Sequence, residues 1–283
     1  MMKKLLFALA MVMLAVSPAM AFDVNFSLDG LWDWGTVYTG GTPTFSAVNS
    51  NPYSGTTSQN LTNGTPALPD VTEDSYGILR VNQINAGPTL LFDRTSSPYE
   101  LTAFFYGFDD TYINGTTTFS RLLSDGGHAA LYQDFAKNYN PLTVPGPQST
   151  AFGGGRSAGD STQFLTVTDG TMVLDLTPRA ILDPSGAVYT LENFFSFTSL
   201  SGSGSVLFDV TGGDWASQFD TNTQDFGTDI KLNFSSFPNT NGNAAWVVQG
   251  TGNARANVIP EPASMILMGI GLAGAARLRR RTA

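Results

Sequence analysis

Apolar and polar side chains alternate along much of the chain with a period of two, and helical periodicity is hard to find. Residues 24–28 and 230–235 alternate cleanly. Because every second side chain of an extended strand points to the same face, this alternation predicts half-buried β-strands. The same reasoning predicts strands at residues 34–39, 78–84, 89–93, 100–108, 129–135, 163–168, 172–176, 187–190, 194–199, 205–210 and 244–249.

Turn signals lie between these predicted strands. Asn114-Gly115, Asp169-Gly170 and the Pro-Ser-Gly segment at 184–186 contain residues that favour tight turns. Asp169-Gly170 is flanked by predicted strands on both sides, so it predicts a β-hairpin. Many short strands joined by glycine-rich turns are typical of an all-β fold. We expect an antiparallel β-sandwich or a jelly-roll-like body.

Two long polar stretches interrupt the predicted strands. Residues 40–70 are rich in Thr, Asn, Ser and Pro, and residues 137–161 contain several prolines and a run of glycines. Each stretch is either a surface loop inserted in one domain or a linker between two domains. One domain is favoured, because the flanking parts do not differ in composition. This gives a single β-sandwich body at residues 22–257.

The first 21 residues have the pattern of a secretory signal peptide. Two lysines precede an apolar run at residues 5–16, and Ala19 and Ala21 form an A-x-A cleavage site. The run is shorter than the roughly 20 residues that a membrane-spanning helix needs. We therefore expect residues 1–21 to be removed while the export machinery carries the chain across the inner membrane.

A second targeting segment is predicted at residues 258–283. The tripeptide Pro260-Glu261-Pro262 precedes an uncharged apolar stretch at residues 263–276. We expect this stretch to form a short transmembrane helix about 21 Å long, in a hydrocarbon core about 30 Å thick that thins locally around it. Arginines beside a membrane span stay on the cytoplasmic side, so the body lies outside the inner membrane. These arginines are Arg277, Arg279, Arg280 and Arg281.

This tail is similar to the PEP-CTERM sorting signal of Gram-negative bacteria, and the resemblance is limited to the tail. It implies that a membrane protease, exosortase, recognises Pro260, Glu261 and Pro262 and then releases or transfers the protein. It also implies that the membrane anchor is transient. The mature product would then lie at the cell surface or in an extracellular matrix of exopolysaccharide.

Composition and charge exclude several functions. The chain has 14 Lys and Arg residues against 23 Asp and Glu, no Cys and a single His. The lack of Cys excludes disulfides and thiolate metal sites, and a single His excludes a metal site with several His ligands from one chain. Several of the basic residues belong to the two ends, so the body is strongly acidic. Nucleic acid is excluded as a partner, since its binding needs clustered Lys and Arg.

Calcium is the one cofactor that the sequence suggests as a candidate. Ca²⁺ binds carboxylate and carbonyl oxygens, which are abundant at turns. Asp109 with Asp110 forms one candidate cluster, and Asp220 with Asp225 lies in another. Neither cluster follows the EF-hand pattern. The alternative is that these aspartates accept hydrogen bonds from nearby backbone amides.

Motifs for catalysis are weak, and we expect no enzyme. Residues 155–159 match the G-x-S-x-G pattern of hydrolases, which needs a strand before it and a helix after it. A stretch rich in Pro and Gly precedes Ser157 instead. The only histidine, His128, comes before the serine, whereas this class of hydrolase has its histidine after the serine.

The leading functional hypothesis is therefore an exported, non-enzymatic protein with a structural, adhesive or aggregation role in an exopolysaccharide matrix. Its expected partners are polysaccharide or other surface proteins. A carbohydrate-binding module is the first alternative, with Trp32 and Trp215 as residues whose flat faces could stack on sugar rings. A secreted hydrolase with two facing carboxylates is the second alternative.

Overall fold

A computed structural model gives the architecture of the chain. It describes residues 21–34, 37–38, 45–46, 61, 63–68, 75–116, 118–140, 165–196, 199, 201–238 and 248–259. The predicted signal peptide before Ala21, including Ala19, lies outside the described residues. The predicted sorting residues from Pro260 to Arg281 also lie outside them.

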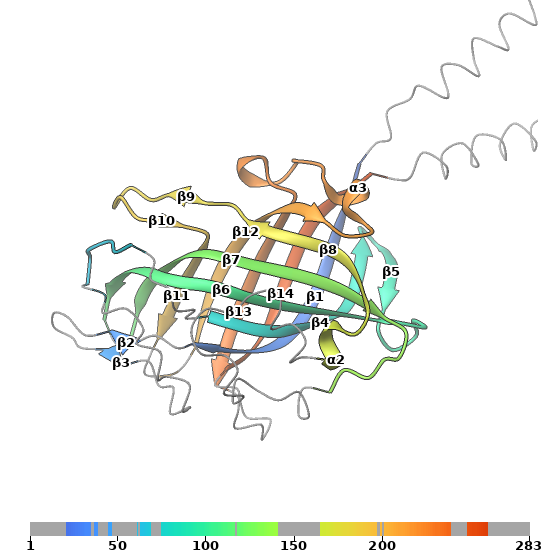
Figure 1. Ribbon diagram of the computed structural model, residues 1–283, viewed down its shortest axis with the longest axis horizontal. Helices are drawn as coiled ribbons and strands as arrows, with labels where there is room; N and C mark the ends of the chain where they lie inside the picture. The colour runs from blue at the N-terminus through green and yellow to red at the C-terminus, as the bar shows by residue number, and fades with distance from the viewer. Residues whose placement is uncertain are drawn as a thin grey trace, which may run out of the picture.

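Strand β1 (Phe22–Trp34) has a neighbour on each edge, and this closes the sheet on itself (Figure 1). One edge pairs with β14 (Val248–Val258) and the other with β4 (Ser75–Ala86), both antiparallel. From β14 the sheet continues through β13 (Ile230–Pro238), β12 (Ser201–Gly212) and β11 (Leu191–Ser196). It then passes through β7 (Ser120–Asp134) and β6 (Glu100–Gly115) and returns to β4. The short strand β5 (Thr89–Asp93) also pairs with β4.

One position in this closed sheet is shared by two shorter strands. β8 (Thr171–Pro178) and β11 both pair with β7 and with β12, each along a different part of those two strands. In Figure 1, β6, β7 and β8 cross in front of β12, β13 and β14. The interior of the molecule therefore lies between these two sides of one sheet.

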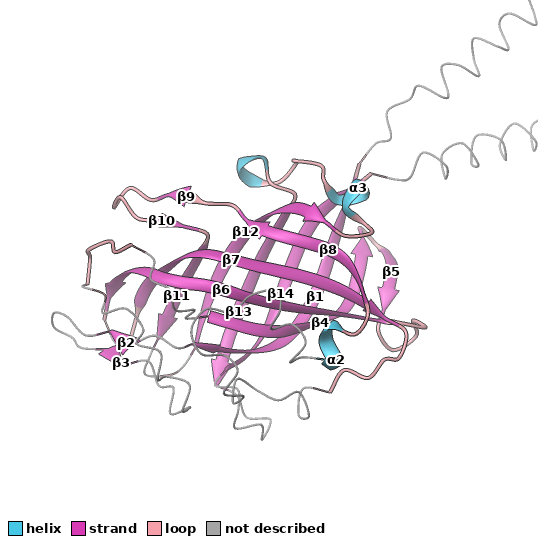
Figure 2. Cartoon of the chain, in the orientation of Figure 1, coloured by secondary structure: helices cyan, strands magenta, loops and turns pink. Residues whose placement is uncertain are grey.

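The prediction of an antiparallel all-β fold is confirmed, and Figure 2 shows how few helical residues the described chain contains. The two separate sheets of a sandwich are not formed, because the long strands of the described residues all belong to one hydrogen-bonded sheet. The physical reason lies in β1, which pairs on both edges and leaves no break between two sheets.

The main core fills the interior. Val24, Phe26 and Leu28 alternate along β1 and all point into this core, as the period of two predicts. Their partners across the interior come from strands on the opposite side of the sheet, such as Val206 and Phe208 of β12. The core is therefore built from residues that are far apart in the sequence.

A second, smaller core lies on the outer side of the sheet. The short helix α2 (Leu165–Thr168) inserts Val167 among Leu31, Tyr76 and Phe104, and Val167 is fully buried there. The hydroxyl of Thr102 donates a hydrogen bond to the Val167 carbonyl at 2.6 Å. The predicted strand at 163–168 is therefore wrong, and so is the β-hairpin at Asp169-Gly170, because the segment before this turn is helical.

The remaining elements are short. They are β2 (Val37–Tyr38), β3 (Phe45–Ser46), β9 (Ile181–Leu182), β10 (Val188–Tyr189), α3 (Ala216–Phe219) and the 3-10 helix η2 (Asp225–Gly227). Within the described residues, no helix has both the length and the apolar character that crossing a membrane requires. The segment at 263–276, predicted as a transmembrane helix, lies outside that part of the chain.

Candidate functional site

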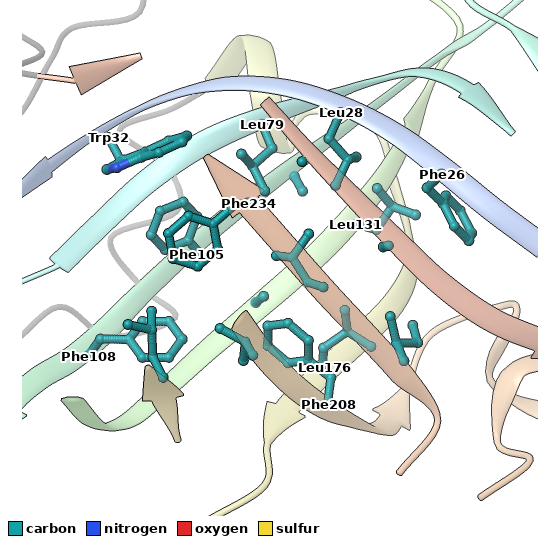
Figure 3. Close-up of a pocket in the computed structure, with 18 of the residues that line it drawn as sticks. Phe26, Leu28, Trp32, Leu79, Phe105, Phe108, Leu131, Leu176, Phe208 and Phe234 are labelled. Carbon is teal, nitrogen blue, oxygen red and sulfur yellow. The ribbon is translucent and has the colours of Figure 1, made fainter. Parts of the chain in front are cut away.

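An apolar cavity of about 120 Å³ lies inside the closed sheet (Figure 3). Its lining comes from β1, β4, β6, β7, β8, β11, β12, β13 and β14, so it is enclosed from all sides of the sheet. Aromatic and aliphatic side chains such as Phe26, Leu131 and Phe208 dominate the lining. None of the lining residues that the structure describes carries a charge.

Small side chains at inward positions create this space. Ala103 of β6, Ala129 of β7 and Ala254 of β14 all line the cavity, and so does Gly252. A closed sheet of about eight strands has an interior that larger side chains would just fill. Small residues on several strands therefore leave an unfilled space inside the sheet.

Several inward-facing side chains are only partly buried although they line the cavity. Leu79, Phe105, Leu176, Leu232 and Phe234 all show this combination, and Figure 3 places these strands' side chains around a common space. Apolar side chains of a densely packed interior normally have contacts on all sides. These five side chains therefore border the cavity without being fully packed.

Four polar side chains line the cavity, those of Ser75 on β4, Ser124 on β7, Asn193 on β11 and Thr251 on β14. The hydroxyl of Ser124 donates to Asp110 Oδ1 at 2.5 Å, so it already has a partner. Asn193 is 2% exposed and also lines the cavity. Its Oδ1 has no hydrogen-bond partner among the described residues. This oxygen has almost no accessible surface, so it is buried beside the cavity rather than exposed to it.

A second hollow, about 360 Å³ and open to solvent, lies on the outer face of β11 to β14. Small polar side chains line it, and Phe194 stands at one side. The ring of Phe194 stacks on that of Phe119 with 5.9 Å between centroids, and both phenylalanines are exposed. The polar side chains are those of Glu192, Ser203, Ser205, Asn233, Ser235, Thr251 and Asn253.

The two tryptophans predicted to stack on sugars do not lie on this face. Trp32 is 5% exposed and packs inside the sheet, with its ring at a steep angle to Phe234. Trp215 is partly buried and stacks on Phe219 beside the core. Burial of the Trp32 ring removes the free flat face that sugar stacking needs, so Trp32 is not a sugar-binding residue in this structure.

The two predicted calcium clusters lie in different parts of the structure. Asp109 and Asp110 are buried on β6, whereas Asp220 and Asp225 are exposed in a different loop. Asp225 forms an ion pair with Lys231 at 2.7 Å. The described residues contain no group of three or more acidic or histidine side chains that could hold a metal ion.

The acidic loop around η2 is organised by hydrogen bonds. Asp229 accepts from the backbone amides of Val210, Thr221 and Asn222 at 2.6 to 2.8 Å. A carboxylate whose oxygens accept hydrogen bonds from three backbone amides has a structural role in the loop. Hydrogen bonding of this kind is what the sequence-based alternative to calcium binding describes for aspartates at turns.

His128 lies on β7, and its Nε2 is 2.6 Å from Asp175 Oδ1 of β8. Its ring also packs against Tyr106, with 5.0 Å between centroids. Ser157, the serine of the G-x-S-x-G segment, lies outside the described residues.

The clearest charge cluster lies on the outer surface. Arg121 of β7 forms ion pairs with Asp183 at 2.6 Å and with Glu192 of β11 at 2.7 Å. The hydrogen bond from the Arg121 guanidinium lowers the pKa of Asp183 to about 2. This cluster joins the β9 segment to the main sheet, and its Glu192 also lines the outer hollow.

Comparison with known proteins concerns the end of the chain. Residues 258–281 match the family model of the PEP-CTERM protein-sorting motif. The tail carries a PEP-CTERM sorting motif. The match starts at Val258, the last residue of β14, and the next residue, Ile259, donates its backbone amide to the Gln218 carbonyl at 2.8 Å. The PEP-CTERM segment therefore begins where the sheet ends.

The resemblance predicted from Pro260, Glu261 and Pro262 is confirmed by this match. The PEP-CTERM motif indicates a secreted protein that exosortase processes and sorts to the cell surface. The chain matches no curated protein and no solved structure.

Sequence reasoning missed the cavity and Asn193. The predicted strand at 194–199 began one residue after this asparagine, whereas β11 runs from Leu191 to Ser196. Asn193 occupies an inward position between the buried Leu191 and Phe195. The local signal that could have identified Asn193 as an inward-facing polar residue is its position midway between two inward apolar residues.

Proposed function

We propose that this protein is an exported, non-enzymatic component of the cell surface or extracellular matrix, delivered there by exosortase processing. The observation that carries the proposal is the PEP-CTERM match at residues 258–281. The position of the motif supports it, because the last strand is complete before the motif's Pro260. Cleavage within the motif would leave every strand of the sheet intact.

The test is the C-terminus of the mature protein. Mass spectrometry of the surface-exposed fraction is expected to show a chain that ends within or before the motif. Replacing Pro260, Glu261 and Pro262 by alanine is expected to keep the whole chain in the membrane fraction. A control variant with Pro145→Ala and Pro147→Ala should be processed normally. A surface product that retains Arg277–Arg281 would contradict the proposal.

We propose carbohydrate binding as the second candidate role of the body. The outer hollow on β11 to β14 supports it, because a shallow surface of hydroxyl and amide groups beside an exposed aromatic ring matches the polar and apolar faces of a sugar. Under this proposal the sugar contacts are Asn233, Asn253 and Phe194 rather than Trp32. An adhesive role in an exopolysaccharide matrix would follow from such binding.

Binding to exopolysaccharide purified from the source cells tests this role. The pair Asn233→Ala and Asn253→Ala, and separately Phe194→Ala, should weaken binding about tenfold, since each removes hydrogen bonds or stacking. Asn82→Ala on β4 is the matched control and should bind normally. Equal binding by all variants would mean that this face is not the contact surface.

A further inference from the structure

Two buried carboxyl groups lie opposite each other at one end of the sheet, and the function proposed above does not involve them. Glu100 is the first residue of β6 and Asp134 is the last residue of β7, and the two are paired directly across the strands. They are 4% and 7% exposed. We infer that these carboxyl groups share one proton, and that this proton is a pH-sensitive latch for residues 135–140, which we call the strap.

The strand pairing brings the two side chains together on the outer face of the sheet. Leu101, the next residue of β6, points into the main core, so Glu100 points outwards. Side chains directly opposite each other on antiparallel strands share one face and have Cβ atoms about 5 Å apart. The carboxyl groups of Glu100 and Asp134 are therefore close neighbours.

The strap is bound to both carboxyl groups through its backbone. The amide of Ala136 donates to Asp134 Oδ1 at 2.8 Å, and the amide of Tyr139 donates to Glu100 Oε1 at 2.6 Å. The ring of Tyr139 packs against the second core. A change in the charge of the carboxyl pair therefore acts directly on the groups that hold the strap to the sheet.

Asp134 Oδ2 is the atom that points to a shared proton. It is buried and has no hydrogen-bond partner among the described residues. Such an acceptor is rare in folded proteins, because it has lost its hydrogen bonds to water without replacement. A protonated Glu100 can supply the missing donor, since a neutral carboxyl group has both an O–H donor and an acceptor oxygen. One proton taken up from solvent leaves a single negative charge on the pair.

The cations around the pair have other partners or none. Arg80 of β4 binds Asp29 of β1 at 2.7 Å. Arg94, between β5 and β6, has a buried Nε without a partner among the described residues. Lys137 of the strap donates to two backbone carbonyls in the same loop as Arg94. The helix α2 adds no titratable side chain. A proton is therefore the simplest way to reduce the charge of the pair.

The sign of the pH dependence follows from the surroundings of Glu100. Burial raises its pKa above the usual 4.5 and Asp134 raises it further, which outweighs the lowering by the Tyr139 amide and by the two arginines. A raised folded-state pKa stabilises the closed arrangement below pH 4.5, and this contribution is lost as the pH rises through the folded-state pKa. Both groups are then ionised, and like charges in a site with little water repel each other. The strap should therefore loosen as the pH rises.

Hydrogen exchange of the full-length protein, measured by mass spectrometry between about pH 5 and pH 8, tests this inference. After correction for intrinsic exchange rates, the protection of a peptide that covers the strap is expected to fall about tenfold as the pH rises. In Glu100→Gln, the side chain keeps a donor for Asp134 and cannot ionise, so the protection should not change with pH. Glu192→Gln, the same change in an ion pair on β11, is the matched control and should behave like the unmodified protein.

A second variant changes the other carboxyl group. Asp134→Asn removes the like charge beside Glu100, so the fall in protection should become smaller, whereas Asp214→Asn, at an exposed position, should leave it unchanged. Far-ultraviolet circular dichroism verifies that each variant is folded. Strap protection that does not change with pH in the unmodified protein would overturn the inference. So would an equal fall in Glu100→Gln or, if that variant does not fold, an equal fall in Asp134→Asn.

Discussion

At the scale of single residues, Trp32 shows how the closed sheet accommodates a large side chain. Its ring lies over Gly250 of β14, and a Cβ atom added at Gly250 would be 2.0 Å from the Trp32 ring. On the other side, a Cβ atom at Gly77 of β4 would be 2.5 Å from Trp32 Cβ. Glycine is required at both positions because the neighbouring strands approach the tryptophan so closely.

Gly250→Ala is expected to destabilise the protein by about 3 kcal/mol, because the added methyl group meets both the Trp32 ring and the backbone carbonyl of Ser235. Gly252→Ala is the control. Its methyl group would meet Leu232 at 3.2 Å, a flexible side chain, so the cost should be below about 1 kcal/mol. Urea unfolding measures both. Equal costs would mean that Trp32 is not packed in this way.

The ion pair of Asp183 predicts a pH dependence. Its folded-state pKa is lowered to about 2 from 3.8, so the pair stabilises the fold above pH 4 and this contribution is lost as the pH falls towards 2. Asp183→Asn should therefore be about 1–2 kcal/mol less stable than the unmodified protein at pH 7. The difference should shrink between pH 4 and pH 2.

The difference between the two proteins is the quantity to measure, because other acids titrate in the same range. Burial raises the pKa of Glu100, which has the opposite effect on stability, but this effect is common to both proteins. Asp214→Asn, at an exposed position, is the control. A stability difference for Asp183→Asn that does not change with pH would contradict the ion-pair explanation.

At the scale of elements, the sequence predicts strands well where large apolar residues alternate with polar ones. Most of the predicted strands lie within observed strands, such as 78–84 within β4 and 205–210 within β12. β14 was largely missed, because its inward positions hold Gly252, Ala254 and Ala256, which are too small to give an apolar pattern. Gly252 and Ala254 also line the cavity, so the missed strand and the missed site have one cause.

The helix α2 was predicted as a strand for a different reason. Its sequence, Leu165 to Thr168, contains two threonines and a valine, which favour strands locally. In the structure, the outer apolar surface of β1, β4 and β6 is covered by this turn of helix. Tertiary packing therefore overrides the local preference.

Val167→Ala is expected to destabilise the protein by about 2 kcal/mol, since it removes two methyl groups from the fully buried second core. Val188→Ala carries the same change at a position that is 44% exposed and should cost less than about 0.5 kcal/mol. Thermal or urea unfolding distinguishes the two. A small effect at Val167 would mean that α2 does not hold this core together.

At the scale of the whole molecule, the closure of the sheet could not be predicted from the sequence. The pairing of β1 with β4 joins residues about fifty positions apart, such as Asp29 and Arg80, which also form an ion pair at 2.7 Å. Alternation reveals that a strand exists but not which strands are its neighbours. The cavity exists because the sheet closes, so the candidate site could not be predicted from the sequence either.

Closure predicts a pattern of amide hydrogen exchange. Central amides of β1 lie between β14 and β4, and they should exchange only when the whole sheet opens. β5 pairs only with β4 among the described strands, so its amides should exchange much faster. Mass spectrometry of peptides from the two strands measures this. Similar rates would show that the sheet opens at β1.

The end of β14 has a mechanical consequence. The sorting motif starts at Val258, and β14 is held by β1 on one side and by β13 on the other. A pulling force on the tail would act along the length of β14, so the hydrogen bonds on both sides would share the load and would have to break together. A force applied through the sorting motif would therefore be resisted by both neighbouring strands at once.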